Sequence, residues 1–131
     1  MSDIRILLVD DEPDIREIAD LSLGLDPEFK TRACASGVDA LAVAAQWVPS
    51  IILLDVMMPL MDGPTTLAKL RQNPRTAGIP ILFLTARTQA EEIAQYISLG
   101  AQGVLSKPFD PMTLAASVRA YLKPAAIHQA C

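Results

Sequence analysis

The sequence predicts a single-domain α/β protein in which a parallel sheet carries helices on both faces. Short apolar runs alternate with longer segments of helical spacing, so that five strand–helix pairs follow one another along the chain. The runs are continuous rather than alternating in their apolar residues, which is typical of strands buried on both sides. The chain has 131 residues and is 51% hydrophobic, which suits one core and leaves no room for a second domain.

The first three helices each begin at a start signal. Glu12 stands where it can interact with the positive end of the first helix, and Pro13 suits the first turn. Ser36 occupies a capping position before the second helix, and Gly63-Pro64 opens the third. The expected strands, in chain order, span residues 4–9, 29–34, 51–54, 79–84 and 104–105.

The last two helices are predicted from local capping patterns. The segment TQAE places Thr88 and Glu91 so that each side chain can satisfy the other's free backbone amide, which is a capping box. Asp110 followed by Pro111 is typical of an N-cap with proline at the first helical position, so the fifth helix is expected to begin there.

Polar side chains stand where four of the five predicted strands end. Asp10 and Asp11 follow the first strand, Asp55 the third, Thr85 the fourth and Lys107 the fifth. In an open parallel sheet, ligands bind outside the carboxyl ends of the strands, at the point where the strand order reverses. The strand order 2-1-3-4-5 would bring these four ends together and leave the uncharged end of the second strand at an edge. We therefore predict this order and a functional site at this end of the sheet.

The residue types at this site predict phosphoryl transfer. Carboxylates packed together repel, and two charges about 4 Å apart cost roughly 4 kcal/mol at an effective dielectric of about 20. Mg²⁺ would relieve this repulsion because it prefers oxygen ligands, and a set made of Asp10, Asp11 and Asp55 without His or Cys argues against zinc. The Lys107 ammonium and the Thr85 hydroxyl can stabilise charge on a phosphoryl group while Asp55 attacks phosphorus.

Composition argues against several other functions. The net charge of −4 and the lack of a basic patch argue against direct nucleic-acid binding. No apolar run is long enough for a membrane span and the N-terminus does not resemble a signal peptide, so a cytoplasmic location is expected. Cys34 is expected to be a buried hydrophobic residue, Cys131 is terminal, and the only histidine, His128, lies in the predicted tail.

Four motifs in chain order, LLVDDE, LLDVMMPLMDG, LTA and SKPF, resemble the receiver domain of two-component response regulators, a family that includes the chemotaxis regulators. The likeness extends over residues 4–122. It implies a flavodoxin-like (βα)5 fold with a doubly wound parallel sheet in the order 2-1-3-4-5. It places the receiver domain at residues 1–124 and a short C-terminal tail at 125–131.

The resemblance implies a magnesium site. By position in the motifs, Asp11 and Asp55 would bind Mg²⁺ directly, and the backbone carbonyl of Met57 would be a third protein ligand. Asp10 would assist, often through a water molecule.

The resemblance also implies which residues carry and contact the phosphoryl group. Asp55 would be the phosphoacceptor, and Thr85 and Lys107 would contact the phosphoryl group. In this family the peptide bond between Lys107 and Pro108 is usually cis, which an X–Pro bond allows at low cost.

Several positions depart from the pattern of well-known members. Val104 stands where many receivers have a Tyr or Phe whose ring changes rotamer on phosphorylation. Thr113 and Ser117 stand where one class of DNA-binding regulators has a Glu and an Arg in its dimer interface. Met57 and Arg87 replace the Asn and Glu that flank the phosphoryl group in the chemotaxis regulator.

The implied function is a signalling switch. It would accept a phosphoryl group from a histidine kinase or a phosphotransfer protein and relay the signal to an effector through protein–protein contact. It is expected to act on no external substrate, although it would catalyse its own phosphorylation and slow dephosphorylation. The fourth helix, fifth strand and fifth helix would form the partner face, with Tyr96 as an exposed anchor off a buried stripe of Ile93 and Ile97.

Two alternative functions stay open. One is a receiver excised from a hybrid kinase or a multidomain regulator, although a chain that ends shortly after the fifth helix favours a stand-alone regulator. The other, from a different class, is an aspartyl-phosphate phosphohydrolase. That enzyme needs a general acid, commonly an Asp two residues after the nucleophile, and Met57 at this position cannot donate a proton.

Overall fold

The computed structural model describes residues 3–122, in which five strands alternate with five helices. The strands are β1 (Ile4–Val9), β2 (Phe29–Cys34), β3 (Ile51–Asp55), β4 (Ile81–Thr85) and β5 (Gly103–Ser106). The helices are α1 (Pro13–Leu23), α2 (Gly37–Trp47), α3 (Gly63–Gln72), α4 (Ala90–Ser98) and α5 (Leu114–Leu122). The predicted strands are therefore all present, with ends that differ from the prediction by two residues or fewer.

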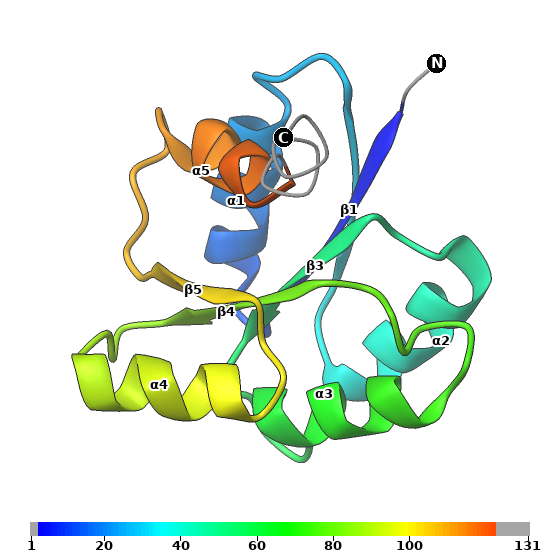
Figure 1. The fold of residues 1–131 in the computed structure, drawn as a ribbon. Coiled ribbons are helices and arrows are strands. Elements are labelled where there is room, and N and C mark those ends of the chain that lie inside the picture. The colour runs from blue at the N-terminus through cyan, green and yellow to red at the C-terminus, as the bar shows by residue number, and fades with distance from the viewer. Residues whose placement is uncertain (1–2, 123–131) are drawn as a thin grey trace, which may run out of the picture.

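The strands form one parallel sheet in the order β2-β1-β3-β4-β5, as predicted. Helices α1 and α5 cover one face of the sheet, and α2, α3 and α4 cover the other (Figure 1). The chain reverses its direction of winding between β1 and β3, so the carboxyl ends of these two strands lie side by side. This reversal creates the crevice in which open α/β sheets bind ligands.

The sheet separates two hydrophobic clusters. Every residue of the two central strands β3 and β4 is buried, which explains their continuous apolar sequences. The cluster under α2, α3 and α4 includes Leu7, Leu54, Leu67 and Phe83. The cluster under α1 and α5 includes Ile6, Leu53, Leu82 and Val118. The edge strand β2 is less buried and keeps only its first and last residues inside, so Cys34 is buried as predicted.

Three helix starts agree with the sequence, since α1 begins at Pro13 as predicted and the starts of α2 and α3 are capped. The Ser36 hydroxyl caps α2 by accepting a hydrogen bond from the Asp39 backbone N–H at 3.1 Å. The Asp62 carboxylate caps α3 by accepting from the Thr65 N–H at 2.8 Å, and that helix begins at Gly63 as predicted.

The predicted capping box at α4 is wrong. The N-cap of this helix is Gln89, and its side chain makes no capping hydrogen bond. The preceding loop is fixed instead by Thr85, whose hydroxyl oxygen accepts a hydrogen bond from the Arg87 N–H at 3.0 Å. The end of β4 therefore determines where the chain leaves the sheet, and Thr88 stands one residue too early to cap the helix.

The predicted start of α5 is also displaced. The Asp110 carboxylate accepts a hydrogen bond from the Met112 N–H at 2.9 Å, as an Asx turn does. The residues after Pro111 form a turn, and the helix itself begins at Leu114.

The orientation predicted for α4 is wrong. Ile97, expected in a buried stripe, is 49% exposed. Tyr96, expected on the surface, is partly buried and packs its ring edge-on against Phe83, with 5.2 Å between the ring centroids. Val104 packs against the same hydrophobic cluster. Tyr96 is therefore part of the packing between α4 and the sheet rather than a free surface anchor.

A long-range ion-pair cluster fastens α5 to the loop between α1 and β2. The Arg119 guanidinium donates to both carboxylate oxygens of Asp26, at 2.7 and 3.1 Å, and to Glu28 at 2.7 Å. It also lies over the Phe29 ring, 5.2 Å from its centroid. These contacts lower the pKa of Asp26, chiefly through its hydrogen bond with Arg119.

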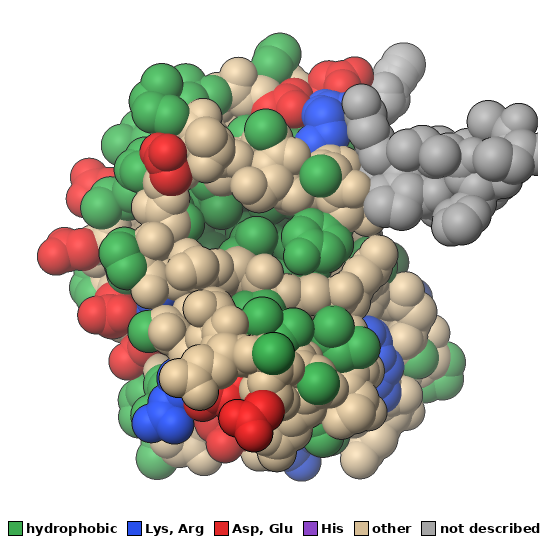
Figure 2. All heavy atoms as spheres, turned by 60° about the vertical axis from the view of Figure 1, so that its left-hand side comes forward, with side chains coloured by type: hydrophobic (Ala, Val, Ile, Leu, Met, Phe, Trp, Pro, Cys, Tyr) green, Lys and Arg blue, Asp and Glu red, His purple; other side chains and the backbone are tan. Residues whose placement is uncertain are grey.

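The face shown in Figure 2 is mixed in charge rather than basic. On the face shown in Figure 2, acidic side chains gather along the left-hand edge and Lys or Arg groups are isolated. This distribution agrees with the net charge of −4 and differs from the continuous basic stripe typical of nucleic-acid-binding proteins. Between residues 3 and 122, no helix combines the length and the apolar character needed to cross a membrane.

Candidate functional site

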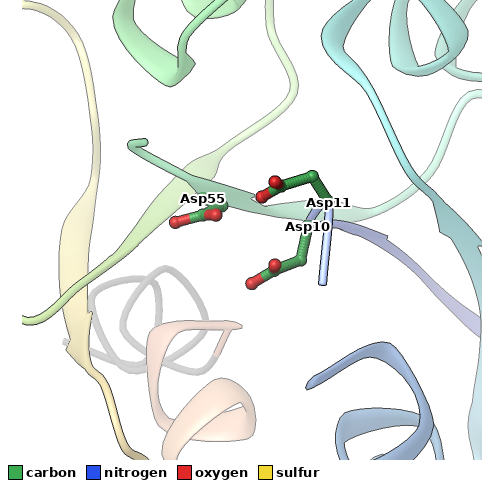
Figure 3. Close-up of side chains that lie close together, drawn as sticks. All are labelled: Asp10, Asp11 and Asp55. Atoms are coloured by element: carbon green, nitrogen blue, oxygen red, sulfur yellow. The ribbon is translucent and has the colours of Figure 1, made fainter. Parts of the chain in front are cut away.

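Three carboxylates meet at the carboxyl ends of the neighbouring strands β1 and β3. Asp10 and Asp11 follow β1, and Asp55 is the last residue of β3. One oxygen from each lies within 4.8 Å of the others, and Figure 3 shows the three side chains gathered at this edge of the sheet. Asp10 and Asp55 are buried, with 0% and 3% exposure, while Asp11 is half-buried. The parallel order β1-β3 causes this convergence, because the first and third strand ends become neighbours.

Lys107 brings a positive charge to the carboxylates from the end of β5. Its Nζ lies 2.9 Å from an Asp10 oxygen and 3.3 Å from an Asp55 oxygen. The bond between Lys107 and Pro108 is cis, as the family resemblance implied. Burial lowers the pKa of Lys107, but hydrogen bonds and charges from Asp10 and Asp55 outweigh this effect and hold it above its ordinary value.

Thr85 and Met57 complete the set of predicted residues at this end of the sheet. Thr85 is buried at the end of β4, and its carbonyl oxygen accepts a hydrogen bond from the Lys107 N–H at 2.9 Å, which joins β4 to β5. Met57 lies in the loop after Asp55, with 74% of its surface exposed. The structure thus brings all six predicted site residues to one region.

An open pocket of about 410 Å³ lies over these groups. Its lining consists of Asp11, Glu12, Asp55, Met57, Thr85, Ala86 and Lys107. The pocket is open to solvent and its lining includes Asp55 and Lys107, so a small charged group can enter and reach the Asp55 carboxylate.

Glu12 and Arg16 also contact residues of this site, which the sequence did not predict. Glu12 was expected to serve the start of α1, but its side chain makes no capping hydrogen bond. Its carboxylate lies 3.4 Å from the Lys107 Nζ instead. Arg16 donates a 2.8 Å hydrogen bond from Nη1 to the backbone carbonyl of Asp10. A cation in the first turn of a helix, where the dipole disfavours it, was the available signal for Arg16.

Asp55 is the strongly perturbed acid of the site. Burial and then the charge of Asp10 raise its pKa from 3.8 to about 6. The Lys107 charge and the Met57 backbone N–H lower the pKa but offset only part of that rise. Asp55 is therefore ionised at neutral pH, at a cost to the stability of the fold.

Asp55→Asn is expected to stabilise the metal-free protein at pH 8. Since the folded pKa is near 6 and the ordinary value is 3.8, the fold favours the protonated acid and loses that contribution as the pH rises through 6. A neutral Asn escapes this loss, which amounts to roughly 2–3 kcal/mol. Urea denaturation in the presence of a chelator should show this difference in the free energy of unfolding at pH 8. The difference should become smaller as the pH falls toward 4. Equal stability of the two proteins at pH 8 would contradict the proposed burial of charge.

Comparison with known proteins identifies a family. The profile described as "Response regulator receiver domain" matches residues 6–119. The response regulator Rre1 of Synechocystis sp. is 40% identical over 116 residues, which cover 88% of this chain and 50% of that protein. The DNA-binding dual master transcriptional regulator RpaA of Synechocystis sp. is 39% identical over 119 residues, which cover 91% of this chain and 49% of that protein.

Solved structures agree with the sequence comparisons. The chemotaxis response regulator CheY4 of Vibrio cholerae superimposes with a TM-score of 0.84 at 32% identity, over 92% of this chain and 99% of that chain. The chain spans about half the length of the two curated relatives named above. The matched region runs from within β1 to within α5, so it includes the acidic pocket. The chain belongs to the receiver domain family of two-component response regulators.

Proposed function

We propose that this receiver domain is a phosphorylatable switch that accepts a phosphoryl group on Asp55, with Mg²⁺ bound, and relays the signal by protein–protein contact. The donor would be a histidine kinase or a phosphotransfer protein. The placement of the Asp55 carboxylate carries this proposal. It faces an open pocket, with oxygens of Asp10 and Asp11 within 4.8 Å and the Lys107 ammonium at 3.3 Å.

The donor atoms at this pocket suit Mg²⁺. They are carboxylate oxygens, and a hard divalent cation prefers a few such ligands together with water and phosphate oxygens. Asp11 and Asp55 would bind the ion directly, the Met57 backbone carbonyl would be a third ligand, and Asp10 would assist, often through water. The repulsion that raises the pKa of Asp55 is a physical reason for the pocket to bind a cation.

The side chains around Asp55 suit an in-line transfer. An Asp55 oxygen would form a bond to phosphorus while the bond from phosphorus to the donor's imidazole nitrogen breaks, and the electron pair leaves with that nitrogen. Lys107 and Thr85 would contact the oxygens of the phosphoryl group. Bound Mg²⁺ supplies further positive charge for these oxygens. Because the pKa of Asp55 is about 6, the nucleophilic carboxylate predominates at neutral pH.

Labelling with acetyl phosphate tests this proposal directly. The purified chain incubated with acetyl phosphate and Mg²⁺ should gain one phosphoryl group in a bond that hydroxylamine cleaves, as an acyl phosphate does. The same incubation with a chelator should give little label. A chain that gains no label, or gains it equally without a divalent cation, would contradict the proposed function.

Mg²⁺ is expected to bind with a Kd roughly in the millimolar range, because the site has few protein ligands. Binding stabilises the fold by mass action, by about 1.4 kcal/mol at ten times the Kd. Thermal melts should therefore rise with Mg²⁺ in the wild type and not in Asp11→Ala. Asp14→Ala is the control, because Asp14 is an exposed carboxylate in the first turn of α1 outside the cluster. The same Mg²⁺ response in wild type and Asp11→Ala would refute the ligand assignment.

Slow loss of the phosphoryl group is expected, because the side chains beside the pocket do not favour attack by water. Met57 is apolar, and Arg87 is turned toward Glu92, 3.6 Å from its carboxylate. Neither is a base at neutral pH. The double variant Met57→Asn, Arg87→Glu adds polar groups that can orient water and should lose label at least about threefold faster, which is roughly 0.6 kcal/mol of barrier. Equal half-lives would show that these positions do not control the lifetime.

The wider setting of the switch is also part of the proposal. Residues 1–124 would form the receiver domain and 125–131 a tail, and the protein would act in the cytoplasm without binding nucleic acid itself. The region around α4, β5 and α5 would form the output face, and Tyr96 would contribute to it through packing rather than as an exposed anchor. Turnover of small phosphate esters would be the result that favours a phosphohydrolase instead.

A further inference from the structure

Arg16 lies in the first turn of α1, against the usual preference of helices. The N-terminus of a helix carries a partial positive charge, so a cation there is disfavoured. Its side chain is half-buried, and within residues 3–122 it forms no ion pair with a carboxylate. Its Nη1 instead donates a 2.8 Å hydrogen bond to the backbone carbonyl oxygen of Asp10. This guanidinium loses part of its hydration and gains one hydrogen bond to a carbonyl group, so its position requires a structural explanation.

That carbonyl is one of four polar groups of Asp10, and each of the other three also has a partner. The Asp10 N–H donates to the Cys34 carbonyl oxygen at 3.1 Å. The Asp10 Oδ1 accepts a hydrogen bond from the Glu12 N–H at 2.9 Å, and Oδ2 accepts from the Lys107 Nζ at 2.9 Å. Arg16 supplies the fourth contact, so every hydrogen-bonding group of this buried residue is held.

We propose that Arg16 is a positioning residue of the acidic pocket. Its guanidinium holds the peptide group that joins Asp10 to Asp11. The orientation of this peptide group determines the direction in which both side chains point. With that peptide held, both carboxylates face Asp55. The inference deepens the proposed function and rests on it, because it assigns Arg16 to the magnesium site.

Two effects of Arg16 on a bound cation have opposite signs. Its positive charge repels a second cation, so if charge alone mattered, removing it would tighten Mg²⁺ binding. Its hydrogen bond orients the ligands, and loss of such a supporting contact typically weakens metal binding by about 10–100-fold. The direction of the change in Kd therefore separates a positioning role from a purely electrostatic one.

The test compares Arg16→Met with Arg32→Met. Both variants remove one positive charge, and Arg32 is an exposed residue of β2 whose guanidinium lies 4.7 Å from the centroid of the Trp47 ring. Arg16→Met should raise the Kd for Mg²⁺ by about tenfold, and Arg16→Lys, which keeps a charge and a donor, should recover part of that loss. Arg32→Met should change the Kd by less than about twofold, because exposed distant charges are screened.

A metal-free measurement separates this inference from the proposed function. The Glu12 N–H, which donates to the Asp10 carboxylate, should exchange with solvent roughly tenfold faster in Arg16→Met than in Arg32→Met or Arg16→Lys. If the wild type shows no Mg²⁺ response but this amide still loses protection, the magnesium site is wrong and the positioning role stands. If Arg16→Met binds Mg²⁺ as tightly as the wild type, or more tightly, and the amide keeps its protection, the positioning role is wrong.

Discussion

Asp55→Asn will abolish phosphorylation by acetyl phosphate in the presence of Mg²⁺, with a loss of at least about 100-fold, or about 2.7 kcal/mol of barrier. An amide is a poor nucleophile and cannot form the acyl phosphate. Mass spectrometry of the intact protein, before and after treatment with hydroxylamine, measures this loss. A loss of this size is expected because Asp55 is buried between Asp10 and Lys107 at the end of the central strand β3.

Two controls make this result specific. Asp62→Asn keeps label, because Asp62 is exposed, lies outside the carboxylate cluster and caps α3, a role that Asn performs equally well. Asp55→Asn is also expected to be the more stable protein at pH 8 without metal, so misfolding cannot account for its loss of label. Label at the wild-type level in Asp55→Asn would move the phosphoacceptor to another residue.

Gly63→Ala will destabilise the fold by about 3 kcal/mol, because overpacking against rigid backbone costs this much. A Cβ at Gly63 would lie 2.5 Å from the Asp55 carbonyl oxygen and 2.9 Å from the Val56 Cα. Both atoms belong to the backbone at the end of β3, so neither can turn aside as a side chain would. The start of α3 can approach the end of β3 this closely only with glycine at this position.

Urea denaturation of Gly63→Ala checks this expectation, with Gly78→Ala as the matched control. Gly78 is exposed, and a Cβ there meets no atom within 4 Å, so its replacement should change the free energy of unfolding by less than about 1 kcal/mol. The displaced atoms belong to the backbone of Asp55 and Val56. The Mg²⁺-dependent rise in melting temperature should therefore also be smaller in Gly63→Ala. Equal stability of the two variants would mean that the backbone at the end of β3 shifts at little cost to accommodate the new methyl group.

Local patterns were sufficient to predict the elements of the fold and their order. The apolar runs identified all five strands, and the carboxylates, hydroxyl and ammonium at their ends identified the pocket. These signals are reliable because strand burial and helix capping depend on residues only a few positions apart, as the bond between Ser36 and the Asp39 N–H shows.

Some local patterns failed where contacts from other elements determine the backbone. The capping box of Thr88 and Glu91 did not form, because the loop before α4 is held by the Thr85 hydroxyl at the end of β4. Similarly, periodicity placed Ile97 inside and Tyr96 outside. In the structure Ile97 is exposed and Tyr96 is partly buried, because the Tyr96 ring packs against Phe83.

The sequence by itself determined the five strand–helix pairs and the residue types that stand where each strand ends. Only the tertiary structure revealed the further contacts between distant charges that strand ends alone do not predict. Lys107 reaches Glu12 across 95 positions, and Arg119 reaches Asp26 across 93. The same holds for Arg16, whose contact with the Asp10 carbonyl depends on the exact path of the chain between β1 and α1. The physical reason is that an ion pair or hydrogen bond depends on distance in space, and that distance exists only after the sheet has brought its strand ends together.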